Sequence, residues 1–295
     1  MRLALYRLHI AIFLAGLTAI FGKLISLNEG ILVWYRMVLT AIFFGGYLAF
    51  RCALPRLPLR DILEISALGV IMALHWVFFY ASIKQANVSI AVVCFALSCF
   101  FTAIFDPLIN KRSASVQEFL LSFLTIIGIA FIFHFDTQYR FGIVLGTISA
   151  AFYGFFTVVG KRIGKKHPAS TLLLYEMAGG GVFLSLLLPV YMFFFPQATL
   201  EIRGYDLIYL LFFVIFCTLW LNLLLFQALH DLSSFTVSLS FNLEPVYSII
   251  LAMIVFNEAR ELGWPFVVGV GLITLSVVLQ SYCALKIQKT LVSRA

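Results

Sequence analysis

Two ionisable side chains lie deep within long apolar stretches of this sequence. Glu244 follows ten residues of the apolar run 234–256, and His75 follows eleven residues of the run 64–84. At about 1.5 Å of rise per helical residue, each lies roughly 15 Å deep, near the middle of a hydrocarbon layer about 30 Å thick. A carboxyl group there can bind an ammonium group or carry a proton, and an imidazole can relay one. The alternative is structural, with a neutral Glu244 hydrogen-bonded to another helix and His75 satisfied in the core.

Other polar and aromatic side chains are predicted to line a cavity together with this pair. They are Ser98, Tyr153, Thr18, Trp76, Tyr80, Asn222 and Asn242. Aromatic residues in apolar runs more often anchor a helix at the membrane surface, and Asn residues more often hydrogen-bond a neighbouring helix. From the residues alone, both interpretations stay open.

Such depths require helices that cross a membrane, and the composition agrees. Hydrophobic residues make up 63% of the chain and charged residues 11%, which is too little charge to cover a water-soluble domain. A span takes about 20 helical residues. The ten apolar runs that meet this need lie at 8–26, 31–51, 64–84, 88–110, 118–134, 141–161, 170–195, 206–228, 234–256 and 264–285.

The basic residues and the cysteines narrow the function classes. The net charge of +7 comes from residues in short connections between apolar runs, so a membrane surface explains it better than nucleic acid does. If the N-terminus is cytoplasmic, 14 of the 20 Lys and Arg residues fall in cytoplasmic segments and 5 in outer ones. Both termini are therefore predicted to be cytoplasmic, in a multi-pass protein of the inner or plasma membrane. The scattered Cys and His residues have no paired spacing, so no metal and no cofactor is predicted.

A faint internal repeat breaks the chain near residue 140. A shift of 146 superposes the third, fourth and fifth apolar runs on the last three, and shifts of 138 and 140 align the first two runs with the sixth and seventh. Because five is an odd number, the second copy must be upside down. The predicted fold is an all-α integral membrane protein with ten transmembrane helices in two inverted five-helix repeats, over 1–139 and 140–295. Secondary transporters use this construction, although an old duplication without mechanical meaning is the alternative.

Four further residues are predicted to serve in gating or structure, namely Arg36, Glu176, Asp106 and Pro245. Arg36 and Glu176 occupy matched positions in the two halves, but inversion separates them by about 13 Å along the membrane normal, so no direct ion pair is expected. Arg36 either supports the outer gate or binds a substrate carboxylate, and Glu176 does the mirrored job on the cytoplasmic side. A structural hydrogen bond to backbone carbonyl groups is the alternative for each. Asp106 either reaches the membrane surface or pairs with a nearby basic residue. Pro245 has no N–H group and should kink its helix beside Glu244.

Short stretches along both halves resemble those of a known family. They are Trp34-Tyr35-Arg36-Met37, Ala86-Asn87-Val88-Ser89, Leu243-Glu244-Pro245-Val246 and Phe256-Asn257-Glu258. By their order and spacing the chain resembles the EamA family of the drug/metabolite transporter superfamily. The resemblance implies small-molecule transport, often export of amino acids or related metabolites, through a cavity between the first, third, fourth, sixth, eighth and ninth helices. Ser98-Cys99 stands where the second half has Glu244-Pro245, so the two halves should not play symmetric roles.

The sequence therefore predicts a secondary transporter that exports small polar metabolites such as amino acids by alternating access. Its expected partners are a small-molecule substrate, membrane lipids and, as a candidate coupling ion, protons, with no nucleic acid and no obligate protein partner. A membrane-embedded transferase needs converging catalytic groups. None is visible, so the chain is not expected to be an enzyme and no catalytic residue is predicted. A lipid scramblase or structural membrane protein is the remaining alternative.

Overall fold

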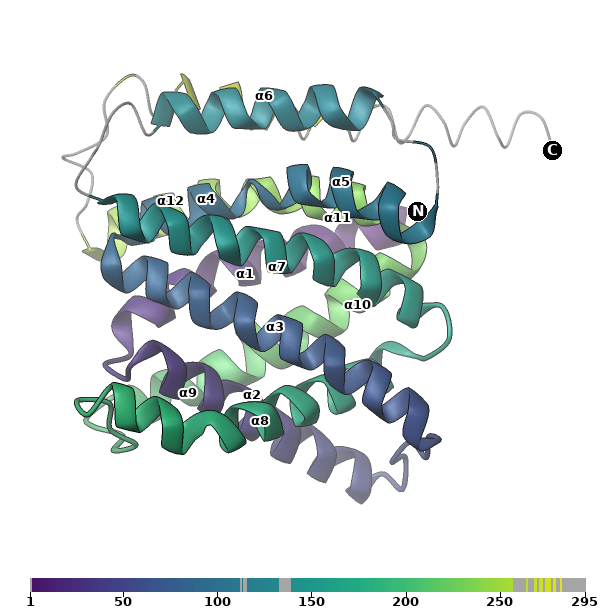
Figure 1. Cartoon of the computed structure of the whole chain (residues 1–295), viewed down its shortest axis with the longest axis vertical. Coiled ribbons are helices and arrows are strands. Elements are labelled where there is room, and N and C mark those ends of the chain that lie inside the picture. The colour runs from purple at the N-terminus through teal and green to yellow at the C-terminus, as the bar shows by residue number, and fades with distance from the viewer. Residues whose placement is uncertain are drawn as a thin grey trace.

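The computed structural model describes residues 2–111, 113, 116–132 and 139–256, and single residues between 264 and 282. The described chain is built from helices (Figure 1). The first half contains α1 (Arg2–Leu24), α2 (Glu29–Phe50), α3 (Leu59–Gln85), α4 (Val88–Phe95), α5 (Ser98–Asn110) and α6 (Val116–Ile132). The second half contains α7 (Arg140–Gly164), α8 (Ala169–Phe194), α9 (Asp206–Val214), the π-helix η2 (Ile215–Trp220), α10 (Leu221–Asp231), α11 (Ser234–Ser240), the 3₁₀ turn η3 (Phe241–Leu243) and α12 (Glu244–Phe256).

The predicted spans coincide with these elements. Within the described ranges, eight helical segments are long and apolar enough to cross a membrane. The run 118–134 falls on α6, whose apolar part, Val116–Gly128, is shorter. The run 264–285 lies largely outside the described residues, as do Asn257 and Glu258. The all-helical membrane fold is thus confirmed, whereas the count of ten and the inversion stay predictions.

The first helix begins earlier than predicted, at Arg2 rather than at residue 8. Hydropathy marks only the apolar part of a span. Arg, Leu and Ala are all strong helix formers, so the helix extends through residues 2–7, where Arg2 and Arg7 flank four uncharged residues.

Side-chain caps start several of the helices. The Asn28 Oδ1 atom accepts from the Gly30 N–H group at 3.3 Å before α2, and the Asn87 Oδ1 atom accepts from the Ile90 N–H group at 2.8 Å before α4. The Ser233 hydroxyl accepts from the Thr236 N–H group at 3.0 Å before α11. These caps satisfy N–H groups that have no partner in the first helical turn. The caps of α4 and α11 stand 146 residues apart, which is the shift of the sequence repeat.

The fourth and ninth predicted spans are broken at matched positions. In the first, the Ala96 and Leu97 N–H groups bond carbonyl groups only three residues back, at 3.0 Å each, before α5 begins. In the second, the 3₁₀ turn η3 precedes α12. The helices that follow, α5 and α12, begin 146 residues apart. Pro245 lies in the first turn of α12, where its missing N–H group costs little, and the first half breaks without any proline. The irregular turn is therefore not an effect of proline alone.

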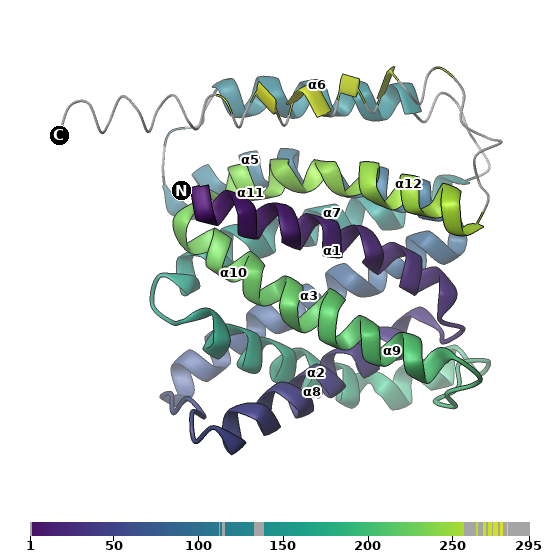
Figure 2. The ribbon, with the colours of Figure 1, turned by 180° about the vertical axis from the view of Figure 1, so that it is seen from behind.

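The helices run side by side across the long face of the molecule, with α6 along one edge and α2 and α8 along the opposite edge (Figures 1 and 2). Inside this arrangement α3 packs against α7 and α8, while α1 packs against α10 and α12. We call the end that holds the α1–α2 and α8–α9 connections the Asp206 end. The end that holds the α2–α3 and α7–α8 connections is the His167 end.

Glycines bring α3 and α8 into close contact. A Cβ atom at Gly69 would lie 2.0 Å from the Glu176 carbonyl oxygen and 2.9 Å from the Gly180 nitrogen. Small residues at such crossings allow backbones to approach closely, which is how helices gain packing energy inside a membrane.

Candidate functional site

A small cavity lies at the centre of the bundle, where α1, α3, α7 and α10 meet the two broken spans. Eight of the predicted side chains line it, namely Glu244, His75, Tyr153, Thr18, Trp76, Tyr80, Asn222 and Arg36. The remaining lining residues are apolar: Ala15, Met72, Phe79, Phe95, Leu221, Leu225 and Phe241. The room for water-sized molecules is about 30 Å³, which suits one or two waters. In this conformation the cavity is too small for an amino acid, and its polar groups are buried.

The guanidinium of Arg36 is held from three directions. Its residue is 1% exposed. Nε donates to Thr218 Oγ1 at 2.7 Å, Nη1 to the Tyr80 hydroxyl at 2.8 Å, and Nη2 to the Cys217 carbonyl oxygen at 2.7 Å. The group also lies 3.6 Å from the ring centre of Trp76, where cation–π attraction stabilises a buried charge. These contacts fix a positive charge at the cavity wall.

A π-helix supplies two of these acceptors. In η2 the backbone widens by one residue per turn, a feature often found at functional sites. Thr218 Oγ1 donates back to the Phe213 carbonyl at 3.1 Å and so presents its lone pairs to Arg36. Asn222 Nδ2 donates to the Thr218 carbonyl at 2.8 Å, which leaves the Asn222 Oδ1 atom buried without a hydrogen-bond partner. An unused acceptor therefore stands at the cavity.

Glu244 brings a carboxyl group to the same cavity. It is the first residue of α12 and is 3% exposed. Across residues 139–256 and the other described segments, no hydrogen bond to its carboxyl group is found, and Arg36 is close enough to interact with it electrostatically. Its place at a helix N-terminus favours a negative charge. The Glu244 carboxyl group is therefore available to bind a ligand.

His75 is fixed in one tautomer by α7. Its Nδ1 atom lies 2.8 Å from Ser149 Oγ and 3.0 Å from the Ser149 backbone carbonyl. The carbonyl can only accept, which favours the tautomer with the proton on Nδ1. Ser149 Oγ donates in turn to the His75 carbonyl at 3.0 Å. Nε2 is then the nitrogen that can gain or lose a proton. The ring packs 5.0 Å from that of Tyr153, whose buried hydroxyl has no hydrogen-bond partner among the described residues.

Two predicted cavity residues lie elsewhere. Ser98 is buried where α5 meets Gly154 of α7, and its hydroxyl has no hydrogen-bond partner in the described part of the chain. Asn242 donates through Nδ2 to Thr125 Oγ1 at 3.2 Å and contacts Cys99 Sγ at 3.4 Å. Asn242 thus joins helices by a hydrogen bond, the alternative that the sequence left open.

Three of the predicted gating residues also lie outside the cavity lining. Asp106 accepts from Asn110 Nδ2 at 2.5 Å near the end of α5. Pro245 lies in the first turn of α12. Glu176 is fully buried on α8, and neither of its carboxyl oxygens has a hydrogen-bond partner within the described ranges. No ion pair joins Glu176 to Arg36, whose donors go to other groups.

Sequence reasoning missed several polar contacts in the core. Thr218 and Ser149 hold Arg36 and His75. A second group joins α5, α7 and α11, where the Thr102 hydroxyl donates to Ser238 at 2.9 Å and Thr157 lies 3.0 Å from Ser238. Ser and Thr occur throughout apolar helices, so only their place around the helix, which sequence depth does not give, could have identified them.

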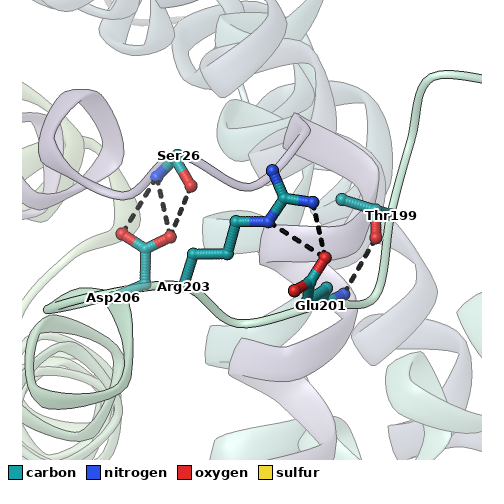
Figure 3. A network of polar contacts seen from close by, with 5 residues as sticks. All are labelled: Ser26, Thr199, Glu201, Arg203 and Asp206. Atoms are coloured by element: carbon teal, nitrogen blue, oxygen red, sulfur yellow. Dashed lines mark hydrogen bonds and ion pairs between the residues drawn. The ribbon is translucent and has the colours of Figure 1, made fainter.

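Hydrogen bonds join the connections at the Asp206 end. The Asp206 carboxylate accepts from the Ser26 N–H group at 3.2 and 3.3 Å and from the Ser26 hydroxyl at 2.5 Å (Figure 3). Lys84 donates to the Leu27 carbonyl, and Tyr191 donates to the Asn28 side chain. The α1–α2 connection is therefore held by α9, α3 and α8 at once.

Asp206→Ala should loosen this connection. Hydrogen bonds to a charged group are worth about 1.5–3 kcal/mol, so the amides of residues 25–28 should exchange with deuterium at least about tenfold faster, measured by mass spectrometry.

Glu201→Ala is the matched control. Glu201 and Arg203 form an exposed ion pair of 2.5 Å in the α8–α9 connection (Figure 3). The Arg203 guanidinium lowers the pKa of Glu201 below its usual value through that hydrogen bond, but exposed pairs contribute little stability. Equal exchange in the two variants would contradict the assigned role of Asp206.

The His167 end is also joined by polar contacts. Lys161 Nζ donates to the Leu229 and Leu232 carbonyl groups, and the Tyr175 hydroxyl donates to the Pro55 carbonyl at 2.7 Å. Nearer the surface, His167 Nε2 lies 3.6 Å from Asp61 Oδ2, and Lys166 Nζ lies 3.2 Å from Glu64 Oε2. A hollow of about 190 Å³ lies at this end, with Arg7, His230 and Asp231 among its lining residues.

Comparison with known proteins identifies the family. The profile of the EamA-like transporter family matches residues 3–134 and 140–282, which is nearly the whole chain. The chain belongs to the EamA-like transporter family. Membership makes it a multi-span membrane transporter with a small-molecule substrate and speaks against an enzyme. In the described part of this EamA-like protein, no cluster of three or more His, Cys, Asp or Glu residues could hold a metal ion.

The relatives of this EamA-like protein carry transporter names without a substrate. An uncharacterized transporter of Haemophilus influenzae is 28% identical over 52% of this chain and 53% of its own length. The uncharacterized transporter YxxF of Bacillus subtilis is 25% identical over 84% of this chain and 80% of its own. An uncharacterized transporter of Archaeoglobus fulgidus is 23% identical over 83% of this chain and 84% of its own length. A crystal structure of a protein with 12% identity has a TM-score of 0.72 and covers 95% of this chain and 98% of that chain, which shows the fold alone.

Proposed function

We propose that this EamA-like protein is a secondary transporter that exports small polar metabolites such as amino acids across the inner or plasma membrane by alternating access. The observation that carries the proposal is the pairing of opposite charges in one central cavity. Arg36 keeps two of its five N–H groups unused, and Glu244 has no hydrogen bond within the described segments. A zwitterion offers a carboxylate to the first and an ammonium group to the second.

The repeated breaks support alternating access. Two halves that recur with the same helix starts can rock around a central site, and α5 and α12 begin at the cavity's two broken spans. In our proposal the Asp206 end faces outward, because the basic residues put the termini on the cytoplasmic side. In this conformation hydrogen bonds join the outer end, and the inner end carries the hollow of about 190 Å³.

Protons are the coupling ion in this proposal. The Glu244 carboxyl group can exchange a proton with cavity water during the cycle, and His75 Nε2 can pass one along the cavity wall. Phe95 and Phe241 line the cavity at the two breaks, where they can exclude water from these groups.

Glu244→Gln should lower transport about tenfold or more in proteoliposomes loaded with a panel of labelled amino acids. The amide keeps the size of the side chain but cannot carry the charge that binds an ammonium group, a loss of about 1.5–3 kcal/mol. Glu201→Gln, at an exposed position, should leave transport unchanged.

Two results would count against the proposal. Unchanged flux in Glu244→Gln would remove this residue from the site. Movement of a fluorescent lipid between leaflets of the same vesicles, with no solute of the panel moving, would favour a scramblase instead.

A further inference from the structure

We propose that Glu176 is a second proton-binding residue, which holds a proton in the resting transporter and shares the charge of Arg36 with Glu244. The coupling part of this inference rests on the proposed function, whereas the protonation of Glu176 does not. The starting observation is a carboxyl group with 0% exposure and with both oxygens buried and unpartnered among the described residues.

The surroundings of Glu176 offer one positive charge. Within the described ranges the ionisable groups that interact with it electrostatically are Arg36, on α2, and Tyr153, on α7. On the α3 side, the backbone around Gly69 packs against the turn of α8 that carries Glu176. Neither α3 nor α10 contributes an ionisable side chain that interacts with it. Any charge on Glu176 must therefore be balanced by Arg36.

Arg36 cannot fully balance two carboxylates. It interacts electrostatically with both Glu244 and Glu176 but forms an ion pair with neither, since its contacts go to Tyr80, Thr218 and Cys217. With both acids ionised, the interior would hold one uncompensated negative charge, which is costly away from water. One of the two acids must therefore hold a proton.

The cavity decides which acid holds it. Glu244 borders the cavity, where water or a ligand can solvate its charge, and it stands at a helix N-terminus that favours the ionised form. Glu176 has neither advantage. The resting proton therefore belongs to a carboxyl oxygen of Glu176.

This arrangement couples the proton to a cationic group in the cavity. The exchange balances for a substrate that carries one net positive charge, because its unpaired ammonium group neutralises Glu244 and leaves the field of Arg36 to act on Glu176. Glu176 can then release its proton to cavity water once the bundle opens, and its carboxylate is balanced by Arg36. One proton leaves as one net positive charge enters, which is the charge balance of an antiporter.

Infrared spectroscopy of the purified full-length protein at neutral pH tests the protonation directly. The wild type should show the carbonyl stretch of a protonated carboxylic acid, Glu176→Gln should lose it, and Glu201→Gln should keep it. Absence of this band in the wild type, or its persistence in Glu176→Gln, would overturn the inference, as would its loss in Glu244→Gln instead.

A second variant covers the case in which Glu176→Gln fails to fold. A neutral buried carboxyl group can be exchanged for an apolar side chain of similar size, so Glu176→Met should melt at the same temperature as the wild type or higher. A markedly lower melting temperature would mean that Glu176 is ionised and paired, against the inference.

Transport adds a separate measurement. In proteoliposomes with a pH-sensitive dye inside and a mixture of amino acids outside, the wild type should move protons with solute, whereas Glu176→Gln should exchange solute without moving protons. Proton movement in Glu176→Gln equal to that of the wild type would refute the coupling role. If the wild type moves no solute, the proposed function fails while the infrared result still decides the protonation of Glu176.

Discussion

Arg36→Lys should nearly abolish transport although it keeps the positive charge. The guanidinium reaches Tyr80, Thr218 and the Cys217 carbonyl from one planar group, and a Lys ammonium cannot match that geometry. A hydrogen bond to a charged group contributes about 1.5–3 kcal/mol, and the same loss in substrate binding corresponds to about 10-fold to 100-fold in flux. The measurement is solute flux per reconstituted protein, with folding checked by size-exclusion chromatography.

Arg203→Lys is the control for the same chemical change at an exposed site. The Arg203→Lys variant should leave flux unchanged, because the ion pair between residue 203 and Glu201 is exposed to solvent. Retention of half or more of the wild-type flux in Arg36→Lys would show that charge alone suffices and that the three-way contact is unimportant.

Gly69→Ala should cause the largest loss of stability. The added methyl group would lie 2.0 Å from the Glu176 carbonyl oxygen and 2.9 Å from the Gly180 nitrogen, both backbone atoms that cannot rotate away. The α3 and α8 helices must separate to admit it, at a cost of about 1–3 kcal/mol or more. A fall of several degrees in the temperature at which the detergent-solubilised protein loses its monodisperse peak should follow.

Gly46→Ala is the matched control on α2. A Cβ atom there meets nothing within 4 Å, and Ala favours a helix over Gly by about 0.5–1 kcal/mol. Its melting temperature should equal that of the wild type or exceed it. An equal fall in the melting temperature of Gly46→Ala and Gly69→Ala would mean that the close approach at Gly69 does not hold α3 against α8.

The sequence predicted the spans well because a physical length sets them. A helix must bury about 20 residues to cross the hydrocarbon layer, so apolar runs mark α2, α3 and α7 to within a few residues. The same depth argument selected Glu244 and His75, which do meet in the cavity. For Glu244 and His75, depth along the helix axis was sufficient to predict a place at the cavity.

Depth alone does not say which way a side chain points around its helix. Ser98 and Asn242 lie close in sequence to cavity residues on neighbouring turns, yet they contact other helices. Arg36 and Glu176 form no ion pair, as expected, but the separation argued from depth is only part of the reason. Tyr80 and the η2 segment accept hydrogen bonds from three of the five N–H groups of Arg36, and such a tertiary contact has no signature in the sequence.

The π-helix has a consequence for motion. Its six residues, Ile215–Trp220, carry one residue more than regular α-helical winding would hold over the same rise. A return to α-helical bonding would turn everything downstream by about 100° about the helix axis. Leu221, Asn222 and Leu225 would then rotate out of the cavity wall, and other faces of α10 would replace them. The segment that accepts two hydrogen bonds from Arg36 is therefore also the one whose winding sets which face of α10 lines the cavity.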